Sequence, residues 1–368
     1  MTKKIPFFDY PQLFNSYEQD LTNIFKDVGK RGAFIMQKDL EEFETNLSDY
    51  TGAKYAIGVA NATDGLQICL MAGELSNQGE VLISSHTMIA TASAIHYAGG
   101  TPVPVECGKN LMIDINSAEE ALTDKTVAIM PTQLNGRTCD MDEIMNFASK
   151  NNLSIYEDAA QALGSKFKNK HAGTFGVASA ISLYPAKILG CLGDGGAILT
   201  NDSDIYERIM LLRDHGRDSK SGEVISWGFN SRLDNIQAAF LNYFFSKYDE
   251  VILKRRHFAQ LYHEGLKEIE EIYLPEPPNN GDHFDVFQNY EIQADNRDEL
   301  KIYLHDKGIG TLVQWGGTPV HKFKSLGFKQ DLPKTEMLFN KLLMLPLNLT
   351  LEDNDIEYIS EHIKDFYS

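Results

Sequence analysis

The sequence predicts an α/β fold in which helices cover a mostly parallel β-sheet. Short apolar runs recur through the first half of the 368-residue chain, and turn residues bound each of them, as expected of buried strands. Segments with apolar residues at helical spacing separate the runs, and this alternation is typical of a doubly wound domain. The runs expected to form strands are residues 55–60, 80–84, 102–105, 126–130, 153–156 and 177–184.

Helical spacing and later apolar runs predict the helices and a second, smaller domain. Residues 16–30, 39–50 and 140–150 each carry an apolar helical face, and 235–266 reads as one long helix leading out of the sheet. Later runs at 287–292 and 310–315 are expected to be strands of a smaller α+β domain. We therefore expect a large domain at 1–248 and a small C-terminal domain at 249–368.

Composition narrows the possible functions. A formal net charge of −18 disfavours non-specific nucleic-acid binding and offers no polybasic patch to an anionic membrane. No segment resembles a signal peptide or a membrane span of ~20 apolar residues. Without CxxC spacing, neither a zinc site nor a disulfide framework is indicated by Cys69, Cys107, Cys139 and Cys191. We expect a cytoplasmic enzyme with buried free thiols and no metal.

Two polar groups follow neighbouring apolar runs in the stretch 154–201. Asp158 ends one run and Lys187 comes just after another, so both are expected at the carboxyl edge of the sheet, where ligands bind in open α/β folds. Glu157 is the rival carboxylate, but successive strand side chains face opposite sides, so only one of the two acids can reach the site. A lysine amine can bind an aldehyde cofactor, and pyridoxal phosphate needs an acid beside its ring nitrogen. On spacing alone, a surface lysine and a helix-capping aspartate are the simpler explanation, because such pairs are common.

A phosphate site is indicated where the first strand turns into a helix at 61–64. The free N–H groups of a helix N-terminus suit a phosphate, and Thr63 could cap this helix and bind the phosphate with its hydroxyl. Threonine and aspartate also begin many helices that bind no ligand.

Ordered motifs give the chain a family resemblance. They are GAFIMQKDLEEFE, YAIGVANATDGL, HTMIATASAI, EDAAQALGS, ISLYPAK, GDGGAILTND, LLRDHG and GFNSRLDNIQAAFL. In this order they resemble the DegT/DnrJ/EryC1/StrS family of pyridoxal-phosphate-dependent nucleotide-sugar aminotransferases. The resemblance implies the type I aminotransferase fold, with a large mostly parallel sheet domain and a smaller C-terminal α+β domain.

The resemblance also implies a cofactor site. Lys187 would hold pyridoxal 5′-phosphate as an internal aldimine and shuttle protons, with pyridoxamine 5′-phosphate as an intermediate. Since residues five apart on a strand face opposite sides, Ser182 and Lys187 can serve one cofactor only if the chain turns at Pro185. Met88 stands where relatives place a ring that stacks on the cofactor. The cofactor-binding residues implied are Ala62, Thr63, Met88, Asp158, Gln161, Ser182 and Asn230.

The implied reaction moves an amino group from glutamate to C3 or C4 of a nucleotide-diphosphate keto sugar, in amino-sugar and polysaccharide biosynthesis. Family members share their active sites across a homodimer, and Asn230 would reach the cofactor of the neighbouring subunit. Candidate substrate contacts are Tyr184, Gln133, Arg232 and His321. For Arg232, a solvated or ion-paired role is at least as simple an explanation. For His321, a surface or satisfied core histidine is the simpler one. The chain departs from its relatives at Met36, Met88, Gln133, Asn135, Gln314 and Trp315.

Other functions within the resemblance stay open. Relatives that dehydrate a keto sugar carry histidine in place of the lysine, so Lys187 argues against that branch. An aminotransferase of a non-nucleotide cyclic ketone, or a regulatory or binding relative without catalysis, are the alternatives.

Overall fold

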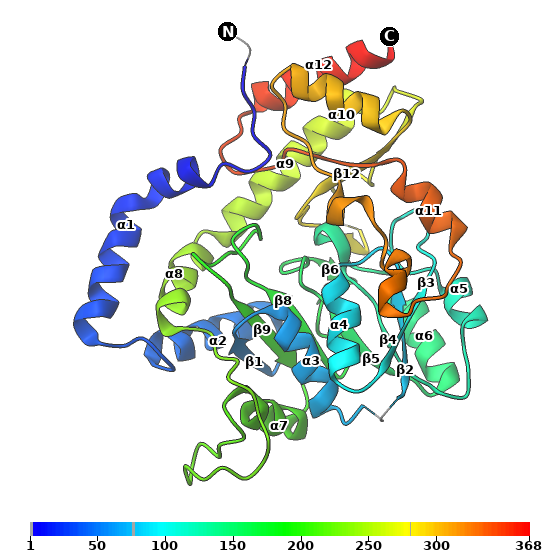
Figure 1. The fold of residues 1–368 in the computed structure, drawn as a ribbon. Coiled ribbons are helices and arrows are strands. Elements are labelled where there is room, and N and C mark those ends of the chain that lie inside the picture. Colours follow the sequence, from blue (N-terminus) through cyan, green and yellow to red (C-terminus); the bar gives the residue numbers. More distant parts are fainter. Residues whose placement is uncertain (1–2, 76–77, 280) are drawn as a thin grey trace.

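A seven-stranded sheet forms the centre of the molecule (Figure 1), of which the computed structural model describes residues 3–75, 78–279 and 281–368. Its strand order is β1-β9-β8-β5-β4-β2-β3. β9 runs antiparallel to the other six strands, which all point the same way, so the predicted mostly parallel α/β sheet is confirmed. The strands are β1 (Tyr55–Val59), β2 (Glu80–Ser84), β3 (Thr101–Val105), β4 (Thr126–Met130), β5 (Ser154–Asp158), β8 (Ala178–Ser182) and β9 (Gly196–Thr200).

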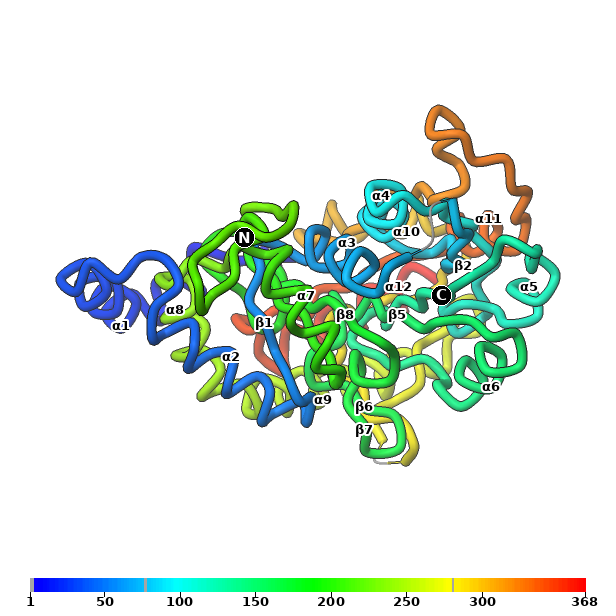
Figure 2. The backbone as a smooth tube through the Cα atoms, turned by 90° about the horizontal axis from the view of Figure 1, so that it is seen from below, coloured from blue at the N-terminus to red at the C-terminus, as the bar shows by residue number. Residues whose placement is uncertain are grey.

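Helices cover both faces of this sheet, as Figure 2 shows from below. Alternate strand residues supply two separate cores: Val81 and Ile83 pack toward one face, while Leu82 packs toward the other. One face is covered by α3 (Ala62–Ala72), α4 (Ile89–Tyr97) and α7 (Ser203–Arg213). The opposite face is covered by α2 (Lys38–Thr51), α5 (Ile115–Glu120), α6 (Met141–Asn151) and α8 (Asn235–Phe245).

The helix expected at 235–266 is two helices. The first, α8, ends at Phe245, and α9 (Tyr248–Leu266) begins after Ser246 and Lys247. Lys247 has φ −111° and ψ 3°, and the Ser246 hydroxyl donates to the Tyr243 carbonyl at 2.7 Å, which ends the first helix. The prediction of one continuous helix is wrong. The apolar residues keep their helical spacing across the break, so the sequence pattern does not show where one helix ends and the next begins.

The C-terminal part has its own core and an antiparallel sheet with strand order β10-β12-β13. The core lies among α9, β10 (Ile272–Tyr273), β12 (Tyr290–Ala294), α10 (Arg297–Asp306), β13 (Leu342–Leu345) and α12 (Asp353–Tyr367). Ile5 joins this core and pairs with Ile309, so the chain's first described residues pack with its last elements. The division into domains at 248/249 remains a prediction.

The prediction of a strand at 310–315 is also wrong. Leu312 makes only an isolated bridge to Met344, and a short 3-10 helix η2 (Gln314–Gly317) follows. Trp315 and Gly316 have positive φ values, which a strand cannot accommodate. The remaining elements are α1 (Tyr10–Arg31), η1 (Leu134–Gly136), β6 (Lys166–Phe167), β7 (Lys170–His171), β11 (His283–Phe284), η3 (Val320–Lys322), η4 (Lys324–Leu326) and α11 (Pro333–Phe339).

Two further predictions concern the cysteines and membrane-spanning helices. Each of the four cysteines is a buried free thiol, as expected. Among the helices formed by the described residues, none has the length and apolar character needed to cross a membrane.

Candidate active site

Asp158 and Lys187 meet at the carboxyl edge of two adjacent strands. Asp158 ends β5 and pairs in register with Ala180 of β8. Beyond β8 the chain turns at Pro185, where the Lys187 N–H donates to the Tyr184 carbonyl at 2.8 Å. The turn that Ser182 and Lys187 require in order to face one site is therefore present.

A chain of three hydroxyls holds the Asp158 carboxylate. Thr91 of α4 donates to Oδ2 at 2.6 Å, Thr87 is 2.7 Å from Thr91, and Thr132 donates to Thr87 at 2.8 Å. The Ala160 N–H donates to Oδ1 at 3.2 Å. Burial raises the pKa of this carboxyl, and these donors, together with the nearby lysine, lower it in part.

Glu157 faces the other side of β5, as strand alternation predicts. Its carboxylate accepts hydrogen bonds from the N–H groups of Gly173 and Phe175, both at 2.7 Å. Gln133 donates to it at 2.8 Å and uses its own carbonyl oxygen to accept from Cys139 N–H at 2.7 Å. Gln133 is 0% exposed. The prediction that Gln133 contacts substrate is therefore wrong: its side chain is a buried support for Glu157.

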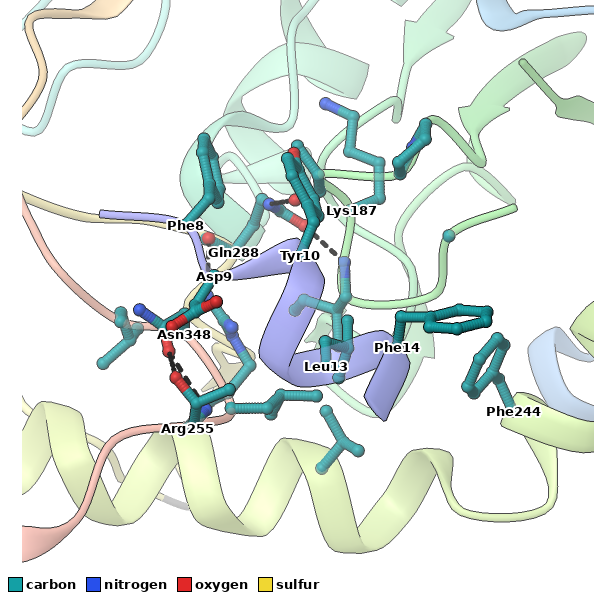
Figure 3. A pocket seen from close by; sticks show the side chains of 18 of the residues that line it. Phe8, Asp9, Tyr10, Leu13, Phe14, Lys187, Phe244, Arg255, Gln288 and Asn348 are labelled. Carbon is teal, nitrogen blue, oxygen red and sulfur yellow. Dashed lines mark hydrogen bonds between the residues drawn. The ribbon is translucent and has the colours of Figure 1, made fainter. Parts of the chain in front are cut away.

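The Lys187 amine is set up to act as a base or nucleophile. Burial lowers its pKa to about 8, although the Asp158 charge pulls the value upward. Behind the lysine segment lies a cavity of about 470 Å³, whose aromatic wall includes Tyr10, Phe14 and Phe244. Figure 3 shows the lysine side chain directed away from Phe14. The backbone of the segment, more than the amine, therefore borders this cavity.

The sheet also brings a phosphate cradle to the same edge. Gly196 pairs with Val59 on one side and Ser182 on the other. A Cβ on Gly196 would lie 2.5 Å from the Asn61 carbonyl carbon, so glycine alone lets the start of α3 approach β9 this closely. The same Cβ would lie 2.7 Å from the Ala62 nitrogen, so the N-terminus of α3, with its free N–H groups, lies against the strand position that pairs with Ser182. These residues fit a phosphate.

One detail of the cradle corrects the sequence prediction. Asn61, and not Thr63, is the N-cap of α3: its side-chain oxygen accepts from the Asp64 N–H at 2.9 Å. Thr63 lies inside the first turn, so the prediction that it caps the helix is wrong. Its hydroxyl is not used for capping.

Comparison with known proteins agrees with this arrangement. The sequence matches the DegT/DnrJ/EryC1/StrS aminotransferase family over residues 15–364. The chain belongs to this family.

Relatives within the DegT/DnrJ/EryC1/StrS family cover nearly the whole chain. A pleiotropic regulatory protein of Geobacillus stearothermophilus is 34% identical, over 99% of this chain and 98% of the relative. The dTDP-3-amino-3,6-dideoxy-alpha-D-galactopyranose transaminase of Aneurinibacillus thermoaerophilus is 35% identical, over 98% of each chain. The crystal structure of DesV from S. venezuelae in complex with a ketimine intermediate superposes with a TM-score of 0.94 and 32% identity, over 100% of this chain and 99% of that one. The predicted type I aminotransferase fold is confirmed.

Two residues that the family resemblance assigns to the cofactor lie near the central pair. Met88 precedes α4, three residues before Thr91, and is 52% exposed. Gln161 lies beyond Asp158, and its side-chain oxygen accepts from the Asn135 N–H at 2.8 Å. That bond fixes the orientation of the Gln161 amide.

The departures from the family at Asn135 and Gln314 come together in space. The Gln314 amide donates to the Asn135 side chain, which in turn donates to the buried Glu291 carboxylate at 2.8 Å. Burial raises the pKa of Glu291 to about 7. Asn135, Gln314 and Glu291, which are far apart in the sequence, thus form a polar cluster that joins the loop after β4 to the C-terminal part.

His321 does not lie open to a substrate. It is 0% exposed, its Nδ1 is 2.7 Å from the Ser85 hydroxyl and its Nε2 is 3.1 Å from Glu336. Both ring nitrogens are therefore used within the protein, and burial lowers the pKa of the ring. The expectation of a substrate contact is wrong, and the alternative of a satisfied core histidine fits.

Three other candidates lie at the surface of the chain. Arg232 forms an ion pair with Asp214 at 3.0 Å, the alternative role expected for it. Asn230 is exposed next to this pair and bridges to Asp214 through the backbone. Tyr184 is exposed beside Pro185. The residue after Asn230, Ser231, accepts a hydrogen bond from the Ala60 N–H at 3.3 Å, so the segment that carries Asn230 lies beside the loop leading into α3.

Sequence reasoning missed the residues that support the central pair. Thr87 lies two residues before α4 and Thr91 lies in its first turns, and no local pattern indicated that both would support Asp158. Gln288 had no local signal. Its amide contacts the peptide groups beside Lys187 from a point about a hundred residues further along the chain.

Proposed function

We propose that this protein is a pyridoxal-phosphate-dependent aminotransferase that moves an amino group from glutamate to a keto group, at C3 or C4, of a nucleotide-diphosphate sugar. The observation that carries the proposal is the pairing of Lys187, with its lowered pKa, and buried Asp158 beside a phosphate cradle. Relatives named as dTDP-, UDP- and GDP-sugar enzymes support the substrate class.

The residues present fit pyridoxal phosphate. When bound, this cofactor supplies an electron-withdrawing ring that stabilises negative charge at the carbon losing a proton. Ala62, Thr63 and Ser182 would bind its phosphate, and Asp158 would hold a proton at its ring nitrogen. Lys187 would attach the cofactor and then, as a neutral amine, take and return a proton at the reacting carbon.

We further propose that the protein works as a homodimer with shared sites. Asn230 is exposed on its own chain, which leaves its side chain accessible to a second subunit. The neighbouring segment exposes Val224, Ile225 and Trp227, and Trp227 is 96% exposed. Large apolar side chains gathered on one exposed segment mark a surface for protein contact.

Turnover of Lys187→Ala tests the proposal. The purified protein is supplied with pyridoxal phosphate, glutamate and a panel of dTDP-, UDP- and GDP-keto sugars, and 2-oxoglutarate is measured. Loss of the proton-transfer amine should lower kcat by at least about 10²–10⁴-fold. Undiminished transamination by the variant would refute the assignment.

The same panel separates the alternatives. A non-nucleotide cyclic ketone included as a competing substrate tests the second enzyme function. One relative is named as a regulatory protein, so a non-catalytic role is tested as well. A protein that binds pyridoxal phosphate, turns yellow, and yet produces no 2-oxoglutarate with any acceptor would favour that role.

A further inference from the structure

We propose that Gln288 is a positioning residue for Lys187, holding the lysine's backbone in place from the C-terminal part of the chain. The inference rests on the proposed function, since it takes Lys187 as the reacting amine. It assigns no contact with substrate or cofactor to Gln288 itself.

The two ends of the Gln288 amide bind the two peptide groups that flank the lysine. Its Nε2 donates to the Ala186 carbonyl at 2.8 Å, and its Oε1 accepts from the Ile188 N–H at 2.9 Å (Figure 3). The lysine's own N–H is held by the Tyr184 carbonyl. Gln288 is 7% exposed, and both hydrogen bonds are partly buried.

This segment needs an external support. Residues 183–195 have no helix or strand, so few of their backbone groups are held by regular secondary structure. Glutamine is the longest side chain with one donor and one acceptor end, and here it acts as a peptide group would in a neighbouring strand. It fixes the backbone on both sides of Lys187 and so limits where the amine can move.

Gln288 is itself held rigidly. Arg255 of α9 donates from Nε to the Phe287 carbonyl at 2.8 Å and from Nη2 to the Gln288 carbonyl at 2.7 Å. Phe287 has φ +53°, an unfavourable conformation for a bulky residue that surrounding contacts must enforce. The Val286 N–H also donates to the Gly136 carbonyl at 2.8 Å. The support therefore runs from α9 through this loop to the lysine.

The position of a reacting amine matters steeply for the rate. A misplacement of about 1 Å can cost about 100-fold in kcat without preventing binding. Loosening the segment would also admit water around the amine and undo part of the desolvation that lowers its pKa. Removal of Gln288 should therefore change both the rate and the titration of Lys187.

The test compares three variants. Gln288→Ala removes both hydrogen bonds, and Gln288→Glu keeps the size but loses the donor to Ala186. Gln237→Ala is the matched control, because Gln237 accepts from the Leu192 N–H at 2.9 Å in the same segment, five residues beyond the lysine. Melting temperatures and cofactor content are measured for each.

Two readouts separate positioning from general support. In the cofactor-free chain, the pH midpoint for acetylation of Lys187, followed by mass spectrometry, should rise from about 8 toward 10.5 in Gln288→Ala and remain near 8 in Gln237→Ala. In the loaded enzyme, kcat should fall by about 10- to 100-fold in Gln288→Ala with KM for the sugar nearly unchanged, and less in Gln288→Glu.

Each other outcome overturns the inference. If Gln288→Ala matches Gln237→Ala in midpoint and kcat, or if both Gln288 variants fail to fold, Gln288 is a structural residue only. Failure of the proposed function looks different: Lys187→Ala would then keep its activity, whatever the Gln288 variants do.

Discussion

At the scale of single residues, the site combines an amine made easier to deprotonate with an acid kept close to it. Desolvation acts on both partners and disfavours both charges, and each charge in turn stabilises the other. The sequence predicted this pair, and strand alternation chose Asp158 over Glu157 correctly. It could not predict the threonine chain behind Asp158, since Thr132 reaches Thr87 only through the pairing of distant strands.

Attachment of the cofactor to Lys187 should depend on pH. Only the neutral amine attacks an aldehyde, so the rate of loading should rise with pH and level off above a midpoint of about 8. In Asp158→Asn the midpoint should move to lower pH, because the carboxylate charge raises the lysine pKa. Stopped-flow absorbance measures both, and a midpoint unchanged by the substitution would contradict the pairing.

Thr91 should affect cofactor binding through its hydrogen bond to Asp158. Thr91→Val removes the donor to Asp158 Oδ2, which raises the pKa of the carboxyl further and weakens its hold on a protonated ring nitrogen. A hydrogen bond to a charged group contributes about 1.5–3 kcal/mol, so cofactor affinity should fall by roughly tenfold or more. Thr91→Ser keeps the hydroxyl and should restore the affinity. Equal cofactor affinities in Thr91→Val and Thr91→Ser would show that the Thr91 hydroxyl does not support cofactor binding.

At the scale of elements, the cradle depends on how closely β9 approaches the start of α3. Strand positions were predictable because each buried strand is a short local run, and β2, β4 and their neighbours lie where expected. The approach itself was not predictable, since Gly196 meets Asn61 only through the antiparallel β1–β9 register. For the same reason the break between α8 and α9 escaped a method that reads local periodicity.

Gly196→Ala should push the two elements apart. Overpacking of this kind costs about 1–3 kcal/mol, measured by denaturant unfolding. Binding of pyridoxal phosphate should weaken by about tenfold or more, while pyridoxal, which lacks the phosphate, should bind as before. Equal weakening of both ligands would show that the substitution acts on the whole site and not on a phosphate cradle.

At the scale of the whole molecule, the proposed site draws on distant parts of the chain and, as we propose, on a second subunit. Motif resemblance indicated Asn230, but the fold places it in an exposed segment of its own chain. Resemblance also pointed to Gln133 and His321, whose buried positions it could not show, because burial depends on the packing of distant elements. The candidate site is thus predictable where residues follow strands of one sheet, and less so where other parts of the chain, or a second chain, contribute.

Mixed dimers test the shared site. Lys187→Ala and Asn230→Ala are each expected to be nearly inactive, but a mixed dimer has one site with both residues intact. After unfolding and refolding together, activity should return to about a quarter of wild type, given random pairing. Lys187→Ala mixed with Asp158→Asn is the control, because both residues belong to one chain's site and no intact site can form. Recovery in neither mixture would contradict the shared site.

The most direct test of the central claim is the residue to which the cofactor is attached. The loaded enzyme is reduced with borohydride, digested, and mapped by mass spectrometry. The account predicts a pyridoxyl group on Lys187, absent when Lys187 is replaced by alanine. A label on a different lysine, or no label on a protein that still transaminates, would contradict it.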